Sequence, residues 1–162
     1  MKTLFLIRHA KSSRDDPTLT DKDRPLTERG VRDASRVGQE LAKRVAKPDL
    51  ILSSPARRAL ATAETVARKL DYKRKDIVIE DRLYAATPDE LLAVVHELDD
   101  NAKSVMLFAH NPELTELAHR LSGKTPRMAT CAVAEFEFDI KSWSNVGVQK
   151  RASYTLHNPK DS

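Results

Sequence analysis

The feature that most constrains the fold of this chain is an alternation between short apolar runs and longer segments with helical periodicity. The apolar runs cover residues 4–7, 50–52 and 105–109, and polar or turn-forming residues end each of them. Runs of this length are too short for helices and are typical of strands buried on both faces of a sheet. A weaker strand is predicted at residues 77–80.

Between these runs, apolar residues recur every three or four positions, as on one face of a helix. The four series are Val31, Ala34, Val37, Leu41 and Val45; Leu60, Ala63, Ala67 and Leu70; Leu91, Val94, Val95 and Leu98; and Leu114, Leu117, Ala118 and Leu121. Strands that alternate with amphipathic helices predict an α/β domain in which helices cover a largely parallel sheet.

The pattern changes near the end of the chain. Apolar Ala132, Ala134, Phe136 and Phe138 alternate with residues 133, 135 and 137, which predicts a strand with one solvated face at an antiparallel edge. Residues 148–156 could pair with it. Because 162 residues suit one hydrophobic core, we expect a single domain spanning residues 1–162.

Three motifs follow three of the predicted strands. Arg8-His9-Ala10 comes after the first strand, Ser53-Ser54-Pro55-Ala56-Arg57-Arg58-Ala59 after the second, and His110-Asn111-Pro112-Glu113 after the run at 105–109. In the second and third motifs a capping residue, Ser54 or Asn111, precedes a proline, which predicts the start of a helix. Neighbouring helical residues point about 100° apart, so only one of Arg57 and Arg58 should face a site; we expect Arg58.

The carboxyl ends of parallel strands meet at one edge of the sheet, where ligands bind. Two arginines, two histidines and two helix N-termini would therefore converge there. Cations, backbone N–H donors and a favourable helix dipole are what a phosphoryl dianion requires. The sequence predicts a phosphoryl site.

The strand-RHA, SSPxxRA and AHNP set resembles the histidine phosphatase superfamily, and the likeness spans nearly the whole chain. The small size, the absence of an inserted cap and the stretches at residues 8–13 and 23–30 look like the SixA-type phosphohistidine phosphatases. The resemblance implies a phosphoglycerate mutase-like fold: a three-layer α/β/α sandwich with a mostly parallel central sheet and an antiparallel edge strand.

By matching motif, the resemblance implies that His9 is the nucleophile, that Arg8 and Arg58 clamp the phosphoryl group and that His110 hydrogen-bonds it. Asn111 is added as a substrate-binding residue. The superfamily's usual glycine after the nucleophile is Ala10 here, and we expect the turn to tolerate it. A neutral imidazole offers a lone pair near neutral pH, and phosphoryl transfer of this kind needs neither a metal nor a cofactor.

The substrate class is predicted from the loop at residues 83–88, where relatives that act on alcohol phosphates tend to supply a carboxylic acid. This loop has none, although Asp81, Asp89 or an acid of the Asp15-Asp16 loop could fold in. Imidazole can leave phosphohistidine without being protonated by the enzyme, so the missing acid favours a phosphorylated histidine on a protein. The alternatives are a phosphatase of small phosphorylated metabolites and a silent domain that only binds phosphorylated ligands.

Other features receive simpler interpretations. Residues 12–25 are interpreted as a solvated loop, and the aspartates at 15, 16, 21 and 23 lack calcium-loop spacing. His96, His119 and His157 are interpreted as ordinary surface or boundary residues, and Cys131 as a buried apolar one. Whether Lys11 or Arg14 joins the site stays open.

Composition bears on partners and location. The net charge of +4 comes from cations spread among 24 acidic residues, and only 5% of residues are aromatic, which argues against a nucleic-acid module. The apolar start is too short for a signal peptide and no stretch could cross a bilayer. We therefore expect a cytoplasmic protein without nucleic-acid or membrane partners.

Overall fold

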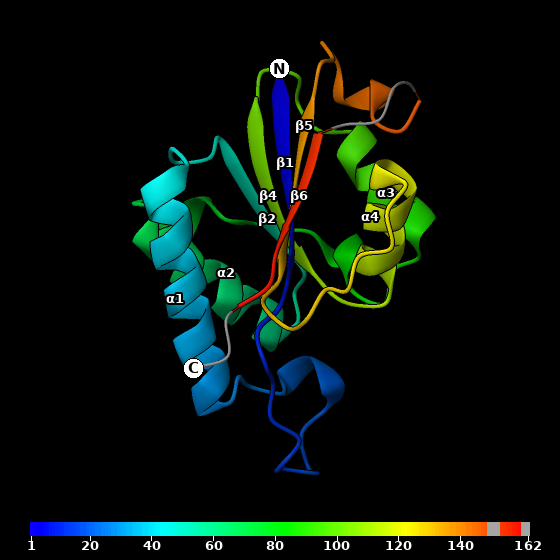
Figure 1. The fold of residues 1–162 in the computed structure, drawn as a ribbon. Helices are drawn as coiled ribbons and strands as arrows, with labels where there is room; N and C mark the ends of the chain where they lie inside the picture. The colour runs from blue at the N-terminus through cyan, green and yellow to red at the C-terminus, as the bar shows by residue number, and fades with distance from the viewer. Residues whose placement is uncertain (149–152, 160–162) are drawn as a thin grey trace.

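The computed structural model describes residues 1–148 and 153–159, and its centre is a six-stranded sheet (Figure 1). The strands are β1 (Lys2–Arg8), β2 (Leu50–Ser53), β3 (Val78–Ile79), β4 (Ser104–Ala109), β5 (Val133–Phe138) and β6 (Ser153–His157). Their order across the sheet is β3-β2-β4-β1-β5-β6. The first four strands in that order are parallel, β5 runs antiparallel to β1, and β6 runs antiparallel to β5.

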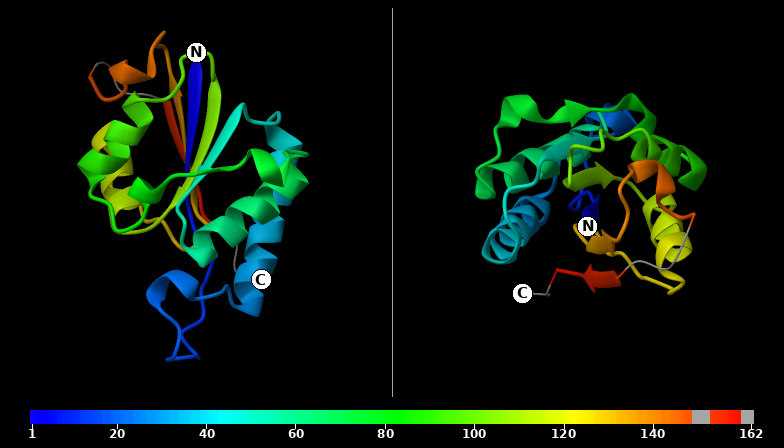
Figure 2. Two further views of the ribbon diagram at one scale, coloured as in Figure 1. Left: turned by 180° about the vertical axis from the view of Figure 1, so that it is seen from behind. Right: turned by 90° about the horizontal axis from the view of Figure 1, so that it is seen from above.

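Four α-helices cover the two faces of the sheet, as the views in Figures 1 and 2 show. They are α1 (Glu28–Arg44), α2 (Arg57–Lys69), α3 (Pro88–His96) and α4 (Glu113–Ser122). Helices α1 and α2 pack on one face, and α3 and α4 lie on the other. The expected α/β/α sandwich of the phosphoglycerate mutase-like type is confirmed. None of the described helices combines the length and the apolar character needed to span a membrane.

The alternation of side chains along β1 explains the two cores. Phe5 and Ile7 pack against α1 and α2, whereas Leu4 and Leu6 pack against α3, α4 and Trp143 on the opposite face. All four of these strand side chains are buried. A strand buried on both faces must be apolar at every position, which is why the run at residues 4–7 shows no alternation.

Most of the helical expectations hold, although the last residues of three series, Val45, Leu70 and Leu98, lie just beyond the ends of α1, α2 and α3. Val31 was expected on the buried face of the first helix, but its residue is 52% exposed, because α1 begins at Glu28 and its first turn extends beyond the sheet. Leu60 is only half-buried, whereas Val66, which the series omitted, lies fully in the core. Thr27 caps α1 as expected, and its side chain accepts a hydrogen bond from the N–H of Gly30.

The antiparallel part of the sheet differs from the expectation. The alternating strand, β5, lies inside the sheet between β1 and β6, so the edge is β6. Val133 was assigned to the solvated face, but it is buried against the α1–α2 core. The expected partner strand at residues 148–156 is found in part, as β6; residues 149–152 lie outside the described part of the chain.

Candidate active site

The three motifs meet because their strands are adjacent and in register. Arg8, at the end of β1, pairs with Ala109, at the end of β4, and Ser53, at the end of β2, pairs with Phe108. The residues that follow these strands therefore emerge side by side at one edge of the sheet. The rings of His9 and His110 lie 5.1 Å apart, centroid to centroid.

His9 is held in a single tautomer by its neighbour. Its Nδ1 lies 2.7 Å from the backbone carbonyl oxygen of Ala10, which can only accept, so Nδ1 carries the proton and Nε2 keeps its lone pair. Burial lowers the pKa of His9 to about 4; the hydrogen bond to Ala10 opposes this shift, and the charges of Arg58 and Arg8 add to it. His9 is therefore neutral at pH 7 with Nε2 available for reaction.

Ala10 fits the position where the superfamily usually has glycine. Ala10 is fully buried, and its N–H donates to Thr62 Oγ1 at 3.0 Å. It is not among the residues with positive φ. The turn accepts the extra methyl group, as expected.

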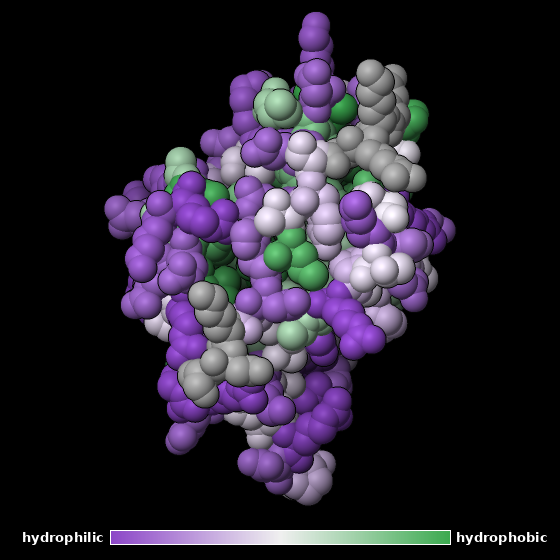
Figure 3. Space-filling model, viewed as in Figure 1, coloured by the Kyte–Doolittle hydropathy of each residue, from purple (hydrophilic) through white to green (hydrophobic). Residues whose placement is uncertain are grey.

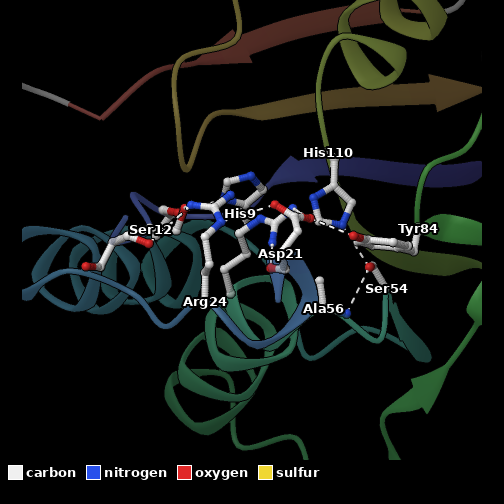
Figure 4. A network of polar contacts seen from close by, with 11 residues as sticks. His9, Ser12, Asp21, Arg24, Ser54, Ala56, Tyr84 and His110 are labelled. Carbon is white, nitrogen blue, oxygen red and sulfur yellow. Dashed lines mark hydrogen bonds and ion pairs between the residues drawn. The ribbon is translucent and has the colours of Figure 1, made fainter. Parts of the chain in front are cut away.

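His110 is oriented by Ser54. His110 Nε2 lies 2.8 Å from Ser54 Oγ, which accepts a hydrogen bond from the N–H of Ala56 (Figure 4). The Ser54 hydroxyl can donate to Nε2 or accept from it, because its oxygen has a second lone pair, so this contact orients the ring of His110 without fixing its tautomer. Burial, followed by the charges of His9 and Arg58, lowers the pKa of His110 to about 3.

Three buried nitrogen atoms around His9 lack a hydrogen-bond partner within the described residues: Arg8 Nε, Arg58 Nε and His110 Nδ1. Buried donors are normally satisfied, and unsatisfied ones cost stability. Two of these atoms belong to guanidinium groups that line the same cleft as His9, and such cationic donors suit the binding of an anion. Arg57, in contrast, is exposed, which agrees with the expected difference between the adjacent arginines.

The cleft over these residues has a volume of about 510 Å³. Lys11 and Arg14 line it, which answers the question that the sequence left open, and so does Asn111. The Asn111 amide is, however, already engaged: its Nδ2 donates to the carbonyl of Met128, and its Oδ1 accepts from Thr115. Asn111 borders the site but has its hydrogen bonds within the protein.

The two helix starts differ from the expected capping. Helix α2 begins after Ala56 and has no side-chain cap, because Ser54 lies two residues before the N-cap position and its hydroxyl contacts Ala56 and His110 instead. At α4 the N-cap position is Pro112, and Asn111, one residue earlier, accepts from the N–H of Thr115. Both residues thus order the loop ends that carry the site.

The loop at residues 12–25 is more than the solvated loop that was expected. It contains a short 3₁₀ helix, η1 (Asp21–Asp23), and Asp21 reaches the site, where its Oδ2 lies 3.0 Å from Arg58 NH2 and 2.6 Å from the Tyr84 hydroxyl. Within this loop, the Arg24 guanidinium donates a hydrogen bond to the Ser12 hydroxyl and so holds the two ends of the loop together (Figure 4). Sequence reasoning missed Asp21, because an aspartate in a charged loop has no pattern that reveals a distant partner.

A second missed acid is Glu113, the first residue of α4. It is 7% exposed and lines the continuation of the cleft beside Ala85 and Ala86, in the loop where no acid was found. Burial raises the pKa of Glu113, and the backbone amides of Glu113 and Ala86 act in the opposite direction. Its position directly after Asn111-Pro112 in the third motif is the sequence signal that could have placed Glu113 near the site.

The other flagged residues lie elsewhere or make other contacts. Asp89 pairs with Arg120, and Asp23 accepts from Thr20. His96 binds the carbonyl of Val146, His119 that of Lys124, and His157 lies near Glu135. Within residues 1–148 and 153–159, no three His, Cys, Asp or Glu side chains are grouped to hold a metal ion.

Comparison with known proteins identifies the family. A model of the histidine phosphatase superfamily (branch 1) matches residues 4–85, which include the first two motifs. An uncharacterised chloroplast protein of Arabidopsis thaliana is 31% identical over 150 residues, which make up 88% of this chain and 69% of that protein.

Two solved structures have the same fold. The SixA candidate of Agrobacterium tumefaciens is 30% identical, with a TM-score of 0.77 over 84% of this chain and 91% of its own. The SixA candidate of Nakamurella multipartitia has a TM-score of 0.85 at 24% identity, over 98% of this chain and 96% of its own. The chain therefore belongs to the histidine phosphatase superfamily, and it is a phosphatase of the SixA type.

Proposed function

We propose that this protein removes phosphoryl groups from phosphohistidine on a protein, through an intermediate phosphorylated on His9. The observation that carries the proposal is the free Nε2 of His9, fixed by the Nδ1–H bond to Ala10, among three buried nitrogens without partners. In this proposal Arg8, Arg58 and His110 bind the phosphoryl oxygens. Asn111 supports the loop that carries His110.

In the first step, the lone pair of His9 Nε2 forms a bond to phosphorus while the bond from phosphorus to the substrate's imidazole nitrogen breaks. The departing ring carries a proton on its other nitrogen, takes the electrons of that bond and leaves as a neutral imidazole. His9 becomes a phosphoimidazolium, whose Nδ1 proton is stabilised by the Ala10 carbonyl. An imidazole is exchanged for an imidazole, so the step needs little driving force, and its rate depends on positioning and on electrostatic stabilisation by the arginines.

In the second step, water attacks the phosphorus, the bond to His9 Nε2 breaks, and inorganic phosphate leaves. His9 departs as a neutral imidazole because Nδ1 has kept its proton throughout. The proton lost by the water passes to phosphate or to solvent. No metal or cofactor takes part in either step.

Three observations support a protein substrate. Exposed side chains, including Lys11, Arg14 and Asp15, form the rim of the cleft, so a histidine on another protein could approach it. Figure 3 shows that the end of the molecule around residues 12–27 is largely hydrophilic on the face in view. The SixA candidate of Agrobacterium tumefaciens, described as a phosphohistidine phosphatase, is a relative at 30% identity.

The test compares turnover of a protein phosphorylated on histidine with turnover of sugar phosphates by the same preparation. We expect the phosphohistidine protein to have the higher kcat/KM. His9→Ala should abolish both activities, and Arg57→Ala, at an exposed position, is the matched control. Equal or faster turnover of sugar phosphates would refute the assignment of the substrate but leave a phosphatase.

One observation favours the second candidate, a phosphatase of small phosphorylated metabolites. Glu113 places a buried carboxyl group with a raised pKa in the same cleft, where it could protonate an alkoxide leaving group. General acids of this kind contribute about 10²- to 10⁴-fold for poor leaving groups. If the protein is a metabolite phosphatase, Glu113→Gln should slow the hydrolysis of alkyl phosphates by this factor and leave the hydrolysis of aryl phosphates unchanged. If it is a phosphohistidine phosphatase, the substitution should have an equally small effect on both rates.

A further inference from the structure

Asp21 places a carboxylate where an anionic substrate binds. Its Oδ2 contacts Arg58 and the Tyr84 hydroxyl, its Oδ1 lies 3.1 Å from Arg24 Nε, and its backbone carbonyl accepts from Arg58 NH1 at 2.7 Å. Figure 4 shows Asp21 in the same polar network as Tyr84, His110 and Ser54. Two terminal nitrogens of Arg58 are thus engaged by one loop residue, while Nε has no partner among the described residues.

Asp21 is a permanent anion. The hydrogen bond from Tyr84, followed by those from Arg58 and Arg24, holds the pKa of Asp21 well below its usual range, although partial burial acts in the opposite direction. Asp21 therefore cannot serve as a proton donor near neutral pH. What it contributes to the site is a fixed negative charge.

The effect of this charge on a substrate depends on where Asp21 lies in the cleft. Asp21 lines both the part of the cleft that contains His9 and the continuation past Tyr84 and Ala86. It therefore stands at the junction of the two parts. A group attached to a phosphoryl held by Arg58 and His110 has to lie close to this junction.

We propose that Asp21 determines which leaving group the site accepts, by placing a fixed negative charge beside it. The proposal rests on the proposed phosphatase function and names its substrate class: phosphoryl groups on a nitrogen ring that is, or becomes, cationic. A phosphorylated imidazole protonated on its far nitrogen is attracted to the carboxylate. A leaving group with a carboxylate or a second phosphate is repelled, which is selection by an unfavourable contact.

The attraction also raises the share of bound substrate whose ring carries this proton, and that is the form that can leave as neutral imidazole. When the far nitrogen of the substrate ring is protonated, the ring takes the electrons of the breaking P–N bond and leaves as neutral imidazole. Asp21 stabilises the protonated ring and takes no proton from it. The electrons and atoms are those of the first step given above, and no further reactant is required.

The experiment measures kcat/KM for three small substrates with the wild type and with Asp21→Asn, which keeps the shape and removes the charge. The substrates are phosphoimidazole, 4-nitrophenyl phosphate and 3-phosphoglycerate. Relative to 4-nitrophenyl phosphate, the variant should lose about tenfold on phosphoimidazole and gain about tenfold on 3-phosphoglycerate. Asp23→Asn, in the same turn but bonded to Thr20, should leave all three values unchanged.

Other results overturn the proposal. If Asp21 only positions Arg58, the variant loses the same factor on all three substrates and the ratios stay constant. If the Asn variant does not fold, Asp21→Ser provides the same comparison of ratios. Failure of the proposed function can be told apart from failure of this proposal. If the wild type hydrolyses neither phosphoimidazole nor a phosphohistidine protein, the proposed function is wrong, and the rates with 3-phosphoglycerate still show whether Asp21 excludes anions.

Discussion

Among single residues, His9 matters most, because its reactivity depends on which ring nitrogen is free. The carbonyl of Ala10 fixes the proton on Nδ1, and burial between two arginines keeps the ring neutral. Burial is the main cause of this lowered pKa, and the charges of Arg58 and Arg8, which would bind the phosphoryl group, add to it.

The first prediction concerns Arg58. Arg58→Lys keeps the charge but loses the planar set of donors, including the buried Nε. We expect kcat to fall by about 10²- to 10³-fold, the loss typical of removing a donor to a developing oxyanion. Steady-state kinetics with 4-nitrophenyl phosphate provide the test, and Arg57→Lys is the matched control. Equal effects of the two substitutions would contradict the role of Arg58.

The second prediction concerns pH. Because the pKa of His9 in the folded state, about 4, lies below the usual 6.5, the ring stays neutral until the pH falls through about 4. NMR titration of the ring nitrogens should place the midpoint there. By linkage, the neutral ring's contribution to stability is complete above pH 6.5 and is lost as the pH falls from 6.5 through 4. A midpoint near 6.5 would show that the ring is not buried in this way.

At the scale of elements, the strand ends and helix starts could be predicted, whereas the loop contacts could not. Arg8, His9, Arg58 and His110 were found because each follows a recognisable strand or opens a helix, and the register of β1, β2 and β4 brings them together. Asp21 was missed because its partners, Arg58 and Tyr84, are 37 and 63 residues away along the chain. Contacts of this kind depend on tertiary structure and leave no periodic signal.

The start of α1 supports the nucleophile loop, and Gly30 makes this testable. A Cβ on Gly30 would lie 2.2 Å from the backbone carbonyl oxygen of Lys11, two residues from His9. Gly30→Ala should therefore destabilise the protein by about 3 kcal/mol and lower kcat, despite the better helix propensity of alanine. Urea unfolding and kinetics measure both effects.

Gly38 in the same helix is the control for this substitution. A Cβ there would lie 2.8 Å from Lys69 Cγ and 3.3 Å from Val66 Cα, which is less severe than the 2.2 Å contact at Gly30 and involves helix α2 instead of the loop of His9. Gly38→Ala should cost less stability and leave kcat unchanged. Equal losses of activity in both variants would contradict the proposed link between α1 and the loop of His9.

At the scale of the whole molecule, two cores hold the sheet from opposite faces, and the site lies at one end of it. The layers were predictable because strands buried on both faces must be continuously apolar. The placement of Val133 and of the β6 edge was not, because an alternating pattern does not say which strand lies outermost. The hydrophobic pattern thus sets the layers, and tertiary packing sets the order at the edge.

A substitution at the end of the sheet opposite the site should lower stability without changing activity. Trp143 is fully buried, donates from Nε1 to the carbonyl of Ala102, and lies beside Lys2 at the start of β1, whereas His9 follows the end of that strand. Trp143→Phe should lower the free energy of unfolding by about 1–3 kcal/mol, since the carbonyl loses its partner. The kcat of the folded protein should not change; a fall in kcat would mean that the two ends of the sheet are coupled.

The most direct test of the whole account is the position of the phosphoryl group during turnover. The enzyme is mixed with excess phosphoimidazole, quenched in alkali, which preserves phosphohistidine, and digested for mapping by mass spectrometry. We predict one phosphoryl group, on His9, and none in His9→Ala. A phosphoryl group on His110, or full turnover by His9→Ala, would contradict the account.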